Sequence, residues 1–494
     1  MAHRLDRREA VVRMGAAMAS IALFPRFAFA RAAVRPDDIV DLAARLRAAS
    51  RADALEVAAG ALGAGATPAT ILGAAFLAGV EDIRPLPGGI LHAVLMVESS
   101  FELAAKSPPR EAALFALYNV DEFKASQASD RQSGDFVLDR PARRRTGGDA
   151  SAARSEYVEA MSAYDPGRAD RAVTALLPHV DQNEFFEILW PLAARSFGAI
   201  GHKIIYAAQV EHVLRRIGWE HAEAPLRSLS MALLVAPQPA TFARARELSP
   251  RLPDGWLSGR EDSAKSEALV AELRPASVSR APEIVVEAFR AGLGPRTVWD
   301  ALTLFGSELF HRRPGRRGAD GGGAILPVHA LTVTNAFRHA FHSTRVDGTK
   351  RLLALQSAAW LAALRDDFVR RVAFSTTGPG LEALGAAAAA AGPAKDLDAL
   401  LERASPDDAR VFLDAHPESA PEYALRIRER LARRVVENHQ VKYAVAMEEE
   451  AARVDPRWRS RLLAPGIDYL AHPKDRDTDV HARSATALDR ALVR

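Results

Sequence analysis

Four histidines occupy matched positions in this chain and could together bind a metal ion. His92 and His202 are separated by 110 residues, and His329 and His439 are separated by the same 110 residues. A single histidine on an apolar helix usually serves as a core residue with a local partner, or it caps its own helix after a preceding Gly or Asn turn. Buried imidazoles need partners, and one metal ion satisfies four nitrogens at once. The matched spacing therefore predicts a site with four histidine ligands.

Lys442 is a candidate fifth ligand. It follows His439 by three residues, so both side chains project from the same face of a helix, whereas the corresponding residue after His202 is Ile205. A protonated lysine has no lone pair to offer a metal. Deprotonated by burial, or converted by carbon dioxide to a carbamate, it can supply a nitrogen or oxygen donor. The alternative is an ion pair between Lys442 and a glutamate such as Glu98 or Glu448.

Two further polar residues lie about two helical turns beyond the histidines. Glu98 and Asn335 each follow their histidine by six residues. We expect Glu98 to act as a base or to support a ligand by hydrogen bonding, and Asn335 to orient a ligand or substrate.

Tyr206 and Tyr443 each follow a histidine by four residues and could donate hydrogen bonds to bound oxygen species. The alternative for both is packing in the core. Three other histidines have no matched partner, and we expect them at the surface or around the ligands: His212, His339 and His342.

An internal repeat explains why the histidines match. Residues 56–79 align without a gap with residues 283–306, and 9 of the 24 positions are identical. The shared residues include Gly65 and Gly292, which end one helix, and Pro68 and Pro295, which begin the next. Each copy is therefore predicted to open with a helical hairpin.

The similarity continues through the histidine segments, with an offset that grows from 227 to 237 across a longer Gly- and Arg-rich loop at 312–323. Apolar residues recur with a helical period throughout, and alternating runs are scarce. We predict an all-α, internally duplicated domain with pseudo-two-fold symmetry. Its halves would be residues 31–270 and 271–494, joined in the Pro-rich stretch 249–282, and together they would form one metal-binding catalytic unit.

The composition excludes several classes of protein. The 65 basic and 62 acidic residues nearly balance, which argues against a nucleic-acid-binding protein. The absence of cysteine excludes disulfides, thiolate metal sites and a cysteine nucleophile. No G-x-S-x-G, H-E-x-x-H, P-loop or dinucleotide motif is present. Beyond the N-terminus, no segment is apolar for long enough to span a membrane. The oligomeric state is left open.

Residues 1–30 are typical of an export signal. Basic residues precede an apolar run from Met14 to Phe24, and Ala28-Phe29-Ala30 has the pattern of a cleavage site. Arg7 and Arg8 before the run resemble a twin-arginine signal. We therefore expect a periplasmic or extracellular protein. An amphipathic N-terminal helix is the alternative.

The order of these segments resembles the questin oxidase-like family of anthraquinone ring-cleaving oxygenases. The similar segments are GGILHAVLMVESSFELA followed by ALFALYNVDEF, then GHKIIYAAQVEHVLRR, and finally NHQVKYAVAMEEEAARVDP. The resemblance implies a non-heme iron, held by His92, His202, His329 and His439 with Lys442 as a carboxylated lysine, that cleaves an aromatic ring with dioxygen. The family's N-terminal helix is rich in histidine, whereas residues 35–80 here contain none.

The sequence thus predicts a metal-dependent oxygenase, with iron as the expected metal, acting on an aromatic or quinone-type small molecule. Two alternatives remain. One is a non-catalytic helical-repeat binding protein, in which the duplication serves packing. The other is a protein that binds haem without covalent attachment, since no CxxCH motif is present.

Overall fold

A computed structural model describes residues 36–139, 149–236, 240–313, 325–371, 380–470 and 472–493. Within these ranges the chain folds into helices joined by short turns, and the one extended pairing is an isolated bridge between Arg260 and Leu293. The predicted all-α class is confirmed. The expected export signal and the basic loop at 140–145 lie outside the described residues.

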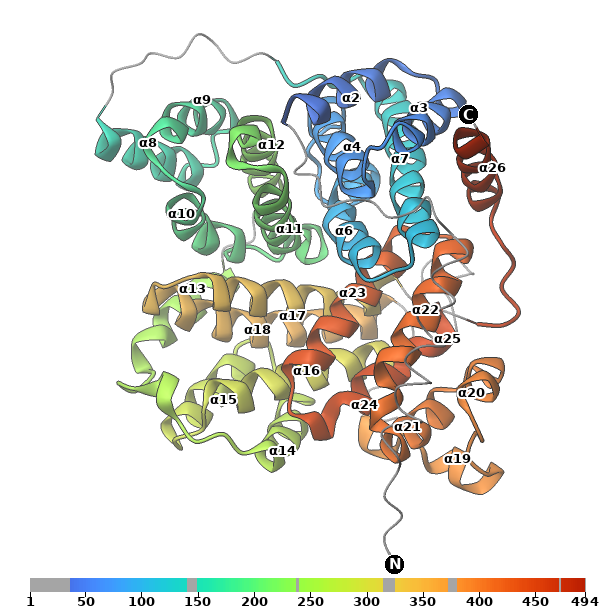
Figure 1. The fold of residues 1–494 in the computed structure, drawn as a ribbon. Helices are drawn as coiled ribbons and strands as arrows, with labels where there is room; N and C mark the ends of the chain where they lie inside the picture. The colour runs from blue at the N-terminus through green and yellow to red at the C-terminus, as the bar shows by residue number, and fades with distance from the viewer. Residues whose placement is uncertain are drawn as a thin grey trace, which may run out of the picture.

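The helices fall into two groups that occupy the upper and lower parts of Figure 1. The first group consists of α2 (Pro36–Ala48), α3 (Arg51–Gly63), α4 (Pro68–Asp82), α5 (His92–Leu95), α6 (Val97–Ala105), α7 (Pro109–Gln132), α8 (Ala150–Ser162), α9 (Pro166–Leu176), α10 (Gln182–Ala194), α11 (His202–Ile217) and α12 (Glu223–Leu233).

The second group begins with α13 (Ala240–Leu248), α14 (Ser263–Leu273), α15 (Arg280–Arg290), α16 (Pro295–His311), α17 (Ile325–Ser343) and α18 (Asp347–Arg371). It continues with α19 (Ala386–Ala391), α20 (Leu397–Arg403), α21 (Pro406–Ala415), α22 (Ala420–Arg434), α23 (Asn438–Arg453), α24 (Arg459–Leu463) and α25 (Ile467–Leu470). The last helix, α26 (Asp479–Val493), lies apart from this group.

The aligned segments form two helical hairpins, α3–α4 and α15–α16. Gly65 and Gly292 both have positive φ angles, +99° and +79°, which end the first helix of each hairpin in a conformation that glycine adopts without strain. Pro68 and Pro295 each stand in the first turn of the second helix. Symmetry over the whole of the two halves stays a prediction.

The second group begins earlier in the chain than the predicted boundary at residue 270. Helix α13 packs on α15 and α18, and α14 packs on α15 and α16. Both helices therefore share a core with the second half, and Figure 1 shows them among its helices. The chain passes between the groups before Ala240 because the apolar residues of α14, such as Leu269 and Leu273, are buried against this core.

Four helices at the centre of the molecule form a ring. Helix α6 packs on α11, α11 on α17, α17 on α23, and α23 on α6. Two of them come from each group, so the middle of the ring is enclosed by both parts of the chain (Figure 1). Side chains on the inner faces of these helices are held by packing from four sides.

A glycine behind each of two histidine helices allows a close approach. A Cβ atom at Gly79 of α4 would lie 2.7 Å from the Cγ2 of Val94, next to His92. A Cβ at Gly306 of α16 would lie 2.9 Å from the carbonyl oxygen of Ala330, directly after His329. These two glycines are a matched pair in the repeat, so the repeat preserves the packing that positions the histidine helices.

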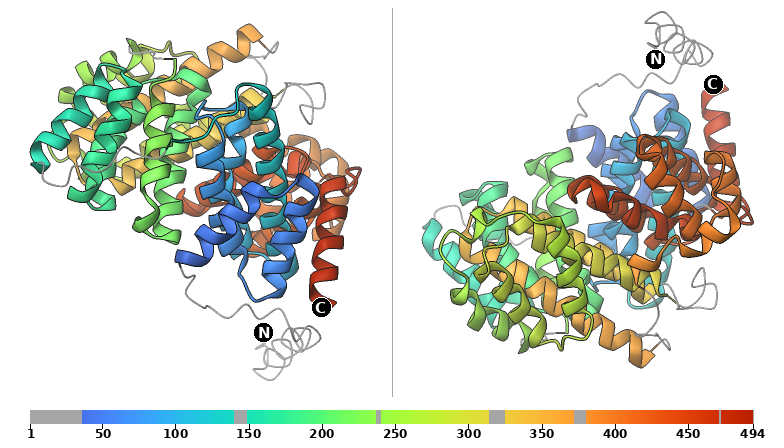
Figure 2. Two further views of the ribbon diagram at one scale, coloured as in Figure 1. Left: turned by 90° about the horizontal axis from the view of Figure 1, so that it is seen from above. Right: turned by 90° about the horizontal axis from the view of Figure 1, so that it is seen from below.

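The C-terminal helix returns to the beginning of the chain. Helix α26 packs on α3 and α7, and Figure 2 shows it beside them. Asp121 on α7 accepts hydrogen bonds from Arg483 of α26 at 2.8 and 3.1 Å and from Arg51 of α3 at 3.0 and 2.6 Å. Helices α3 and α26 are therefore both joined to α7 through Asp121.

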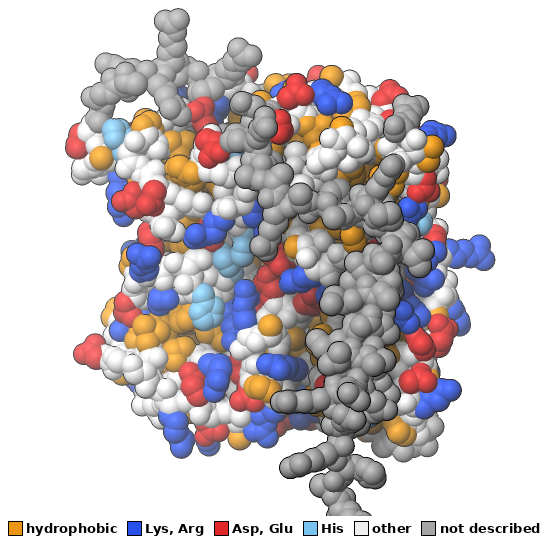
Figure 3. Space-filling model, viewed as in Figure 1, with side chains coloured by type: hydrophobic (Ala, Val, Ile, Leu, Met, Phe, Trp, Pro, Cys, Tyr) orange, Lys and Arg blue, Asp and Glu red, His pale blue; other side chains and the backbone are white. Residues whose placement is uncertain are grey.

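Among the described helices, none combines the length and the apolar character needed to cross a membrane. On the face shown in Figure 3, acidic and basic side chains are interspersed, with no broad area of one sign. That face offers no basic stripe of the kind that nucleic-acid binding requires.

Candidate metal centre

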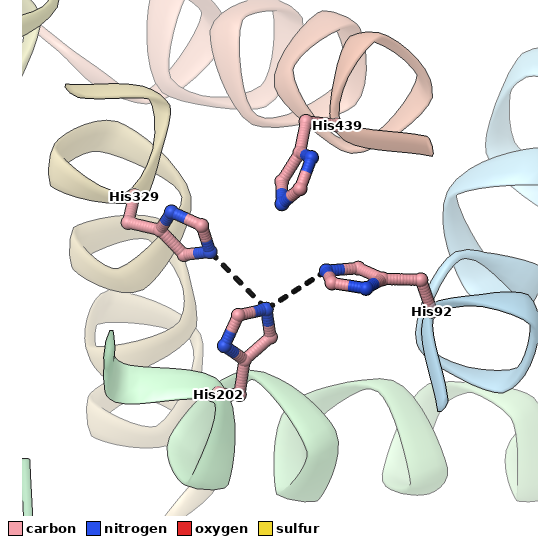
Figure 4. Close-up of side chains that lie close together, drawn as sticks. All are labelled: His92, His202, His329 and His439. Carbon is pink, nitrogen blue, oxygen red and sulfur yellow. Dashed lines mark hydrogen bonds between the residues drawn. The ribbon is translucent and has the colours of Figure 1, made fainter. Parts of the chain in front are cut away.

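The four matched histidines converge in the middle of the ring. His92 and His202 are the first residues of α5 and α11, His439 is the second residue of α23, and His329 lies in the second turn of α17. In five of their six pairs the ring centroids are 4.5 to 6.4 Å apart, and each residue is at most 9% exposed. Figure 4 shows the rings pointing toward one another from four directions. The predicted convergence is confirmed.

Local hydrogen bonds fix the protonation of three of the rings. In each, Nδ1 faces a backbone carbonyl oxygen of the preceding turn: Gly89 for His92 at 2.6 Å, Ala199 for His202 at 2.6 Å, and Ile325 for His329 at 2.5 Å. A carbonyl oxygen only accepts, so Nδ1 carries the hydrogen and donates it. In a neutral imidazole the other nitrogen, Nε2, then has a free lone pair. These contacts do not cap the helices, because a cap must accept from free backbone N–H groups, but they orient the rings inward.

The fourth ring is oriented by a carboxylate. Nδ1 of His439 lies 3.0 Å from Oε2 of Glu437, and the hydroxyl of Tyr469 donates to Oε1 of the same glutamate at 2.5 Å. Glu437 precedes α23 with an extended backbone, which turns its side chain back toward the helix. A carboxylate behind a histidine is a common support for metal ligands because it fixes the ring and raises its basicity.

The inward-facing nitrogens are closer than free lone pairs allow. Nε2 of His202 lies 3.0 Å from Nε2 of His92 and 3.1 Å from Nε2 of His329. None of these atoms carries a hydrogen in the tautomer that the carbonyls favour, so their lone pairs repel unless a positive charge lies between them. Two nitrogens about 2.1 Å from one metal ion, at a right angle, lie about 3.0 Å apart. The donor set therefore fits a transition-metal ion.

The fourth ligand nitrogen completes the same cluster. Nε2 of His439 is buried and has no hydrogen-bond partner among the described residues. One ligand atom from each histidine lies within 4.8 Å of the others. A buried nitrogen left without a partner carries a desolvation penalty that a metal would remove.

The surroundings keep the four imidazoles neutral. Burial lowers the pKa of each ring well below its usual range, and the positive charge of Lys442 contributes in the same direction at all four. Three of the rings stand at or next to the first residue of a helix, where the partial positive charge of the helix end also opposes protonation. Neutral imidazole is the form that binds metal.

Lys442 is buried beside this cluster without a partner. The residue is 3% exposed, and its Nζ makes no hydrogen bond to any described residue. Burial lowers its pKa to about 7, which makes the neutral amine accessible. Of the two glutamates expected as partners, Glu448 pairs with Arg428 at 2.7 Å, and Glu98 makes no contact with the amine. The ion-pair alternative is therefore wrong.

A narrow cavity of about 30 Å³ adjoins the cluster at Lys442. On three helices its walls come from the third, sixth, seventh and tenth residues after the histidine. These are Ile205, Ala208, Gln209 and His212 on α11, Thr332, Asn335, Ala336 and His339 on α17, and Lys442, Val445, Ala446 and Glu449 on α23. Glu98 and Ser99 of α6 hold the sixth and seventh positions after His92. The cavity thus continues the face of each helix that carries a ligand.

Glu98 and Asn335 both line this cavity, as their spacing predicts. Oε2 of Glu98 accepts a hydrogen bond from the Ser99 hydroxyl at 3.2 Å, while its Oε1 has no partner among the described residues. Burial raises the pKa of Glu98 to about 8. The amide of Asn335 donates to Glu449 at 2.9 Å and to Glu450 at 3.0 Å, so it orients two acidic side chains of α23.

The two predicted tyrosines lie outside the cavity lining. The Tyr206 hydroxyl bonds to Ser228 Oγ at 2.8 Å, and the Tyr443 ring stacks on Phe310 at 4.0 Å between centroids. Both are completely buried. The Tyr443 hydroxyl is buried and has no hydrogen-bond partner among the described residues. Both rings pack in the core, and the expectation that they meet bound oxygen species stays a prediction.

His212 and His339, expected to be unmatched, occupy equivalent positions ten residues after His202 and His329. Their rings are 4.0 Å apart at the end of the cavity remote from the ligands. Glu449 holds the same position on α23. His342, by contrast, is exposed. The sequence does contain a signal for His212 and His339: each lies ten residues after one of the four clustered histidines. Comparing the two halves at a fixed offset does not reveal it.

Against known proteins, no family model matches this chain, and no curated protein or solved structure matches it, so the resemblance to the questin oxidase-like family stays a prediction.

Proposed function

We propose that this protein is a metal-dependent oxygenase that holds iron through His92, His202, His329 and His439. The observation that carries the proposal is the convergence of the four rings, with Nε2 of His202 at 3.0 Å from Nε2 of His92 and at 3.1 Å from Nε2 of His329, and with the ligand atoms of all four within 4.8 Å of one another. A buried set of nitrogen donors beside a cavity suits a redox metal with one accessible position. Bound iron would supply the electrons and the open position needed to activate dioxygen.

Lys442 is the residue that we assign to the cavity side of the centre. Its neutral amine can bind directly, or it can add to carbon dioxide, forming an N–C bond and releasing one proton, to give a carbamate with oxygen donors. Its burial and its lack of a hydrogen-bond partner support either form. The surrounding apolar residues, among them Ile205 and Val445, exclude bulk water from this side.

Two observations weigh against the alternative functions. A haem needs open space between two axial histidines, whereas here each imidazole has at least two of the others with centroids 4.5 to 6.4 Å away. A purely structural repeat gives no reason for unprotonated nitrogens to face one another in the core. Both readings are less consistent with the site than a metal centre.

Metal content tests the site. We expect the purified protein, reconstituted with ferrous iron, to bind one ion per chain, and His202→Ala or His329→Ala to abolish stoichiometric binding. His342→Ala is the matched control, because it removes an exposed imidazole from the same helix as His329 and should leave the content unchanged. Elemental analysis after gel filtration makes the measurement. Equal metal content in all four proteins would refute the site.

Oxygen chemistry is tested separately. The cavity of about 30 Å³ has room for dioxygen or two to three waters, so an aromatic ring requires side chains at its mouth to move. We expect the iron-loaded protein to consume dioxygen with a hydroxylated anthraquinone as the probe and to place labelled oxygen in the product. Metal binding without oxygen uptake, over a panel of phenols and quinones, would reduce the proposal to a metal-binding protein.

A further inference from the structure

A second layer of polar residues closes the cavity at the end remote from the metal ligands. We call Glu98, His212, His339 and Glu449 the distal cluster. Lys442 lines the cavity at the third position after its histidine, whereas His212, His339 and Glu449 line it at the tenth. Seven residues of a helix span about 10 Å. The cavity therefore connects the metal centre with a group of acids and bases that plays no part in holding the metal.

Unpartnered polar atoms stand at both ends of this passage. Oε1 of Glu98 is buried and makes no hydrogen bond to any described residue, and Nζ of Lys442 is in the same state. Each lines a cavity of about 30 Å³, which has room for two to three water molecules. Water placed there would satisfy both atoms and would join them by a short chain of hydrogen bonds.

The charges around Glu98 come from all four helices of the ring. They are Glu102 on α6, His212 and Arg216 on α11, His339 on α17, and Glu449 and Arg453 on α23. Burial, followed by the charges of Glu449 and Glu102, raises the pKa of Glu98, while Arg216 and His339 act in the opposite direction. The carboxyl group is therefore poised to hold a proton near neutral pH and to release it.

The distal cluster also has a connection to the surface. Nε2 of His339 pairs with Oε2 of Glu211, whose other oxygen accepts from Arg215 at 2.6 Å. A guanidinium does not give up its proton, but the imidazoles themselves reach solvent: the His339 side chain is 12% exposed and His212 is partly exposed. His212 lies against the His339 ring, 4.0 Å between centroids. Imidazoles in this position can pass protons between solvent and the cavity.

We propose that the distal cluster is a proton-transfer station, with Glu98 as the group that faces the cavity and His212 and His339 as its link to solvent. Glu98 gives its proton to a cavity water, which passes a proton on to an anionic oxygen of the reacting substrate at the Lys442 end. The Glu98 carboxylate then recovers a proton from solvent through the imidazoles, so one proton moves inward in each cycle. The delivery of the proton to the Lys442 end rests on the proposed oxygenase function. The exchange of a proton between Glu98 and solvent does not.

Infrared spectroscopy of the metal-free protein tests the station without any activity. We expect a carbonyl stretch of a protonated carboxyl group that disappears on titration from pH 6 to pH 10 and shifts in heavy water. Glu98→Gln should remove this band, and Glu111→Gln, a matched change outside the cavity, should keep it. A band that persists in Glu98→Gln, or no titrating band in the native protein, would overturn the proposal.

Kinetics of the iron-loaded protein test what the station supplies. Glu98→Gln should retain full metal content but lower kcat by about 10²- to 10⁴-fold, with loss of the alkaline limb of the pH profile. Glu98→Asp should recover part of the rate. A pH profile unchanged in Glu98→Gln would refute proton delivery. If the native protein consumes no dioxygen, the proposed function fails, whereas the infrared result still decides whether Glu98 holds an exchangeable proton.

Discussion

At the scale of single residues, the four imidazoles differ in the group that accepts the hydrogen bond from Nδ1. Three donate Nδ1–H to backbone carbonyls, and only His439 is backed by a carboxylate, that of Glu437. Tyr469 in turn donates to this carboxylate and holds it in place. A negative charge behind one ligand makes His439 the most basic donor of the set.

Replacement of Glu437 tests this support. We expect Glu437→Gln to lower the affinity for the metal by about 10- to 100-fold, because the amide holds the ring less firmly and removes the charge. Glu422→Gln, at an exposed position on the preceding helix, is the control. Competition with a chromophoric chelator measures both affinities. Equal affinities would show that Glu437 only caps its helix.

The neutral histidines also give the metal-free protein a characteristic pH dependence. Their pKa values in the folded state lie well below 6.5, so the folded protein stays unprotonated when the unfolded chain takes up protons. Stability is therefore present above about pH 6.5 and decreases as the pH falls. The slope is up to about 1.4 kcal/mol per pH unit for each histidine.

His202→Gln isolates the contribution of one ring. Relative to the native protein, this variant should gain stability as the pH falls from 7.5 to 5.5, by up to about 1.4 kcal/mol per unit. Urea unfolding of both metal-free proteins at the two pH values supplies the comparison. A difference in unfolding free energy that does not change with pH would mean that the pKa of His202 is the same in the folded and the unfolded chain.

At the scale of helices, the glycine behind each ligand helix sets the position of the histidines. At Gly306 the close neighbour is backbone, the carbonyl oxygen of Ala330, whereas at Gly79 it is the side chain of Val94. A side chain can rotate away, but a helix must move as a whole. The α16–α17 contact is therefore the less tolerant of the two.

Gly306→Ala should destabilise the protein by about 1–3 kcal/mol and weaken metal binding, because it displaces α17 and with it His329. Gly348→Ala is the matched control. It lies in helix α18, where a Cβ meets nothing within 4 Å, so the same substitution there should be neutral or stabilising by up to about 1 kcal/mol. Thermal unfolding and metal titration of both variants make the comparison. An equal effect at the two positions would contradict the packing argument.

The sequence predicted the elements and the ligands because both leave local signs. Gly65 and Pro68 end and begin helices through backbone preferences alone, and the 110-residue spacing repeats in each copy. Of the distal cluster, Glu98 was predicted from its spacing to His92, whereas His212 and His339 were expected to be unmatched. Glu437 and Glu449 left no such sign. The direction of a side chain at a helix end, and the layer shared by His212 and His339, depend on how four helices meet, which no single segment specifies.

At the scale of the whole molecule, the two groups of helices are not independent. Each contributes two ligands and two helices of the central ring, and α26 carries the end of the chain back to α3 and α7. Asp121, with a side chain that is 2% exposed, binds arginines from both of its neighbours. We therefore expect the molecule to unfold as one cooperative unit.

Asp121→Asn tests the contact that closes the molecule. We expect a loss of about 1–3 kcal/mol, because two arginines lose a shared buried carboxylate. The unfolding should remain a single transition. Asp479→Asn is the control, since it removes a carboxylate that also binds Arg483 but is 85% exposed. Calorimetry that resolves two transitions in the native protein would show that the two groups of helices fold separately.

The four nitrogen donors have a consequence for which metal ion the proposed site would take up. Imidazole sites bind divalent ions in the general order iron, cobalt, nickel, copper, with zinc below copper, so this centre by itself favours competitors over iron. Its rings are fixed by backbone and by Glu437 and are neutral before any ion arrives. Because the site is preorganised, it would bind the ion that is most available in the compartment where the chain folds. The metal found in the isolated protein will therefore report the cellular compartment of folding.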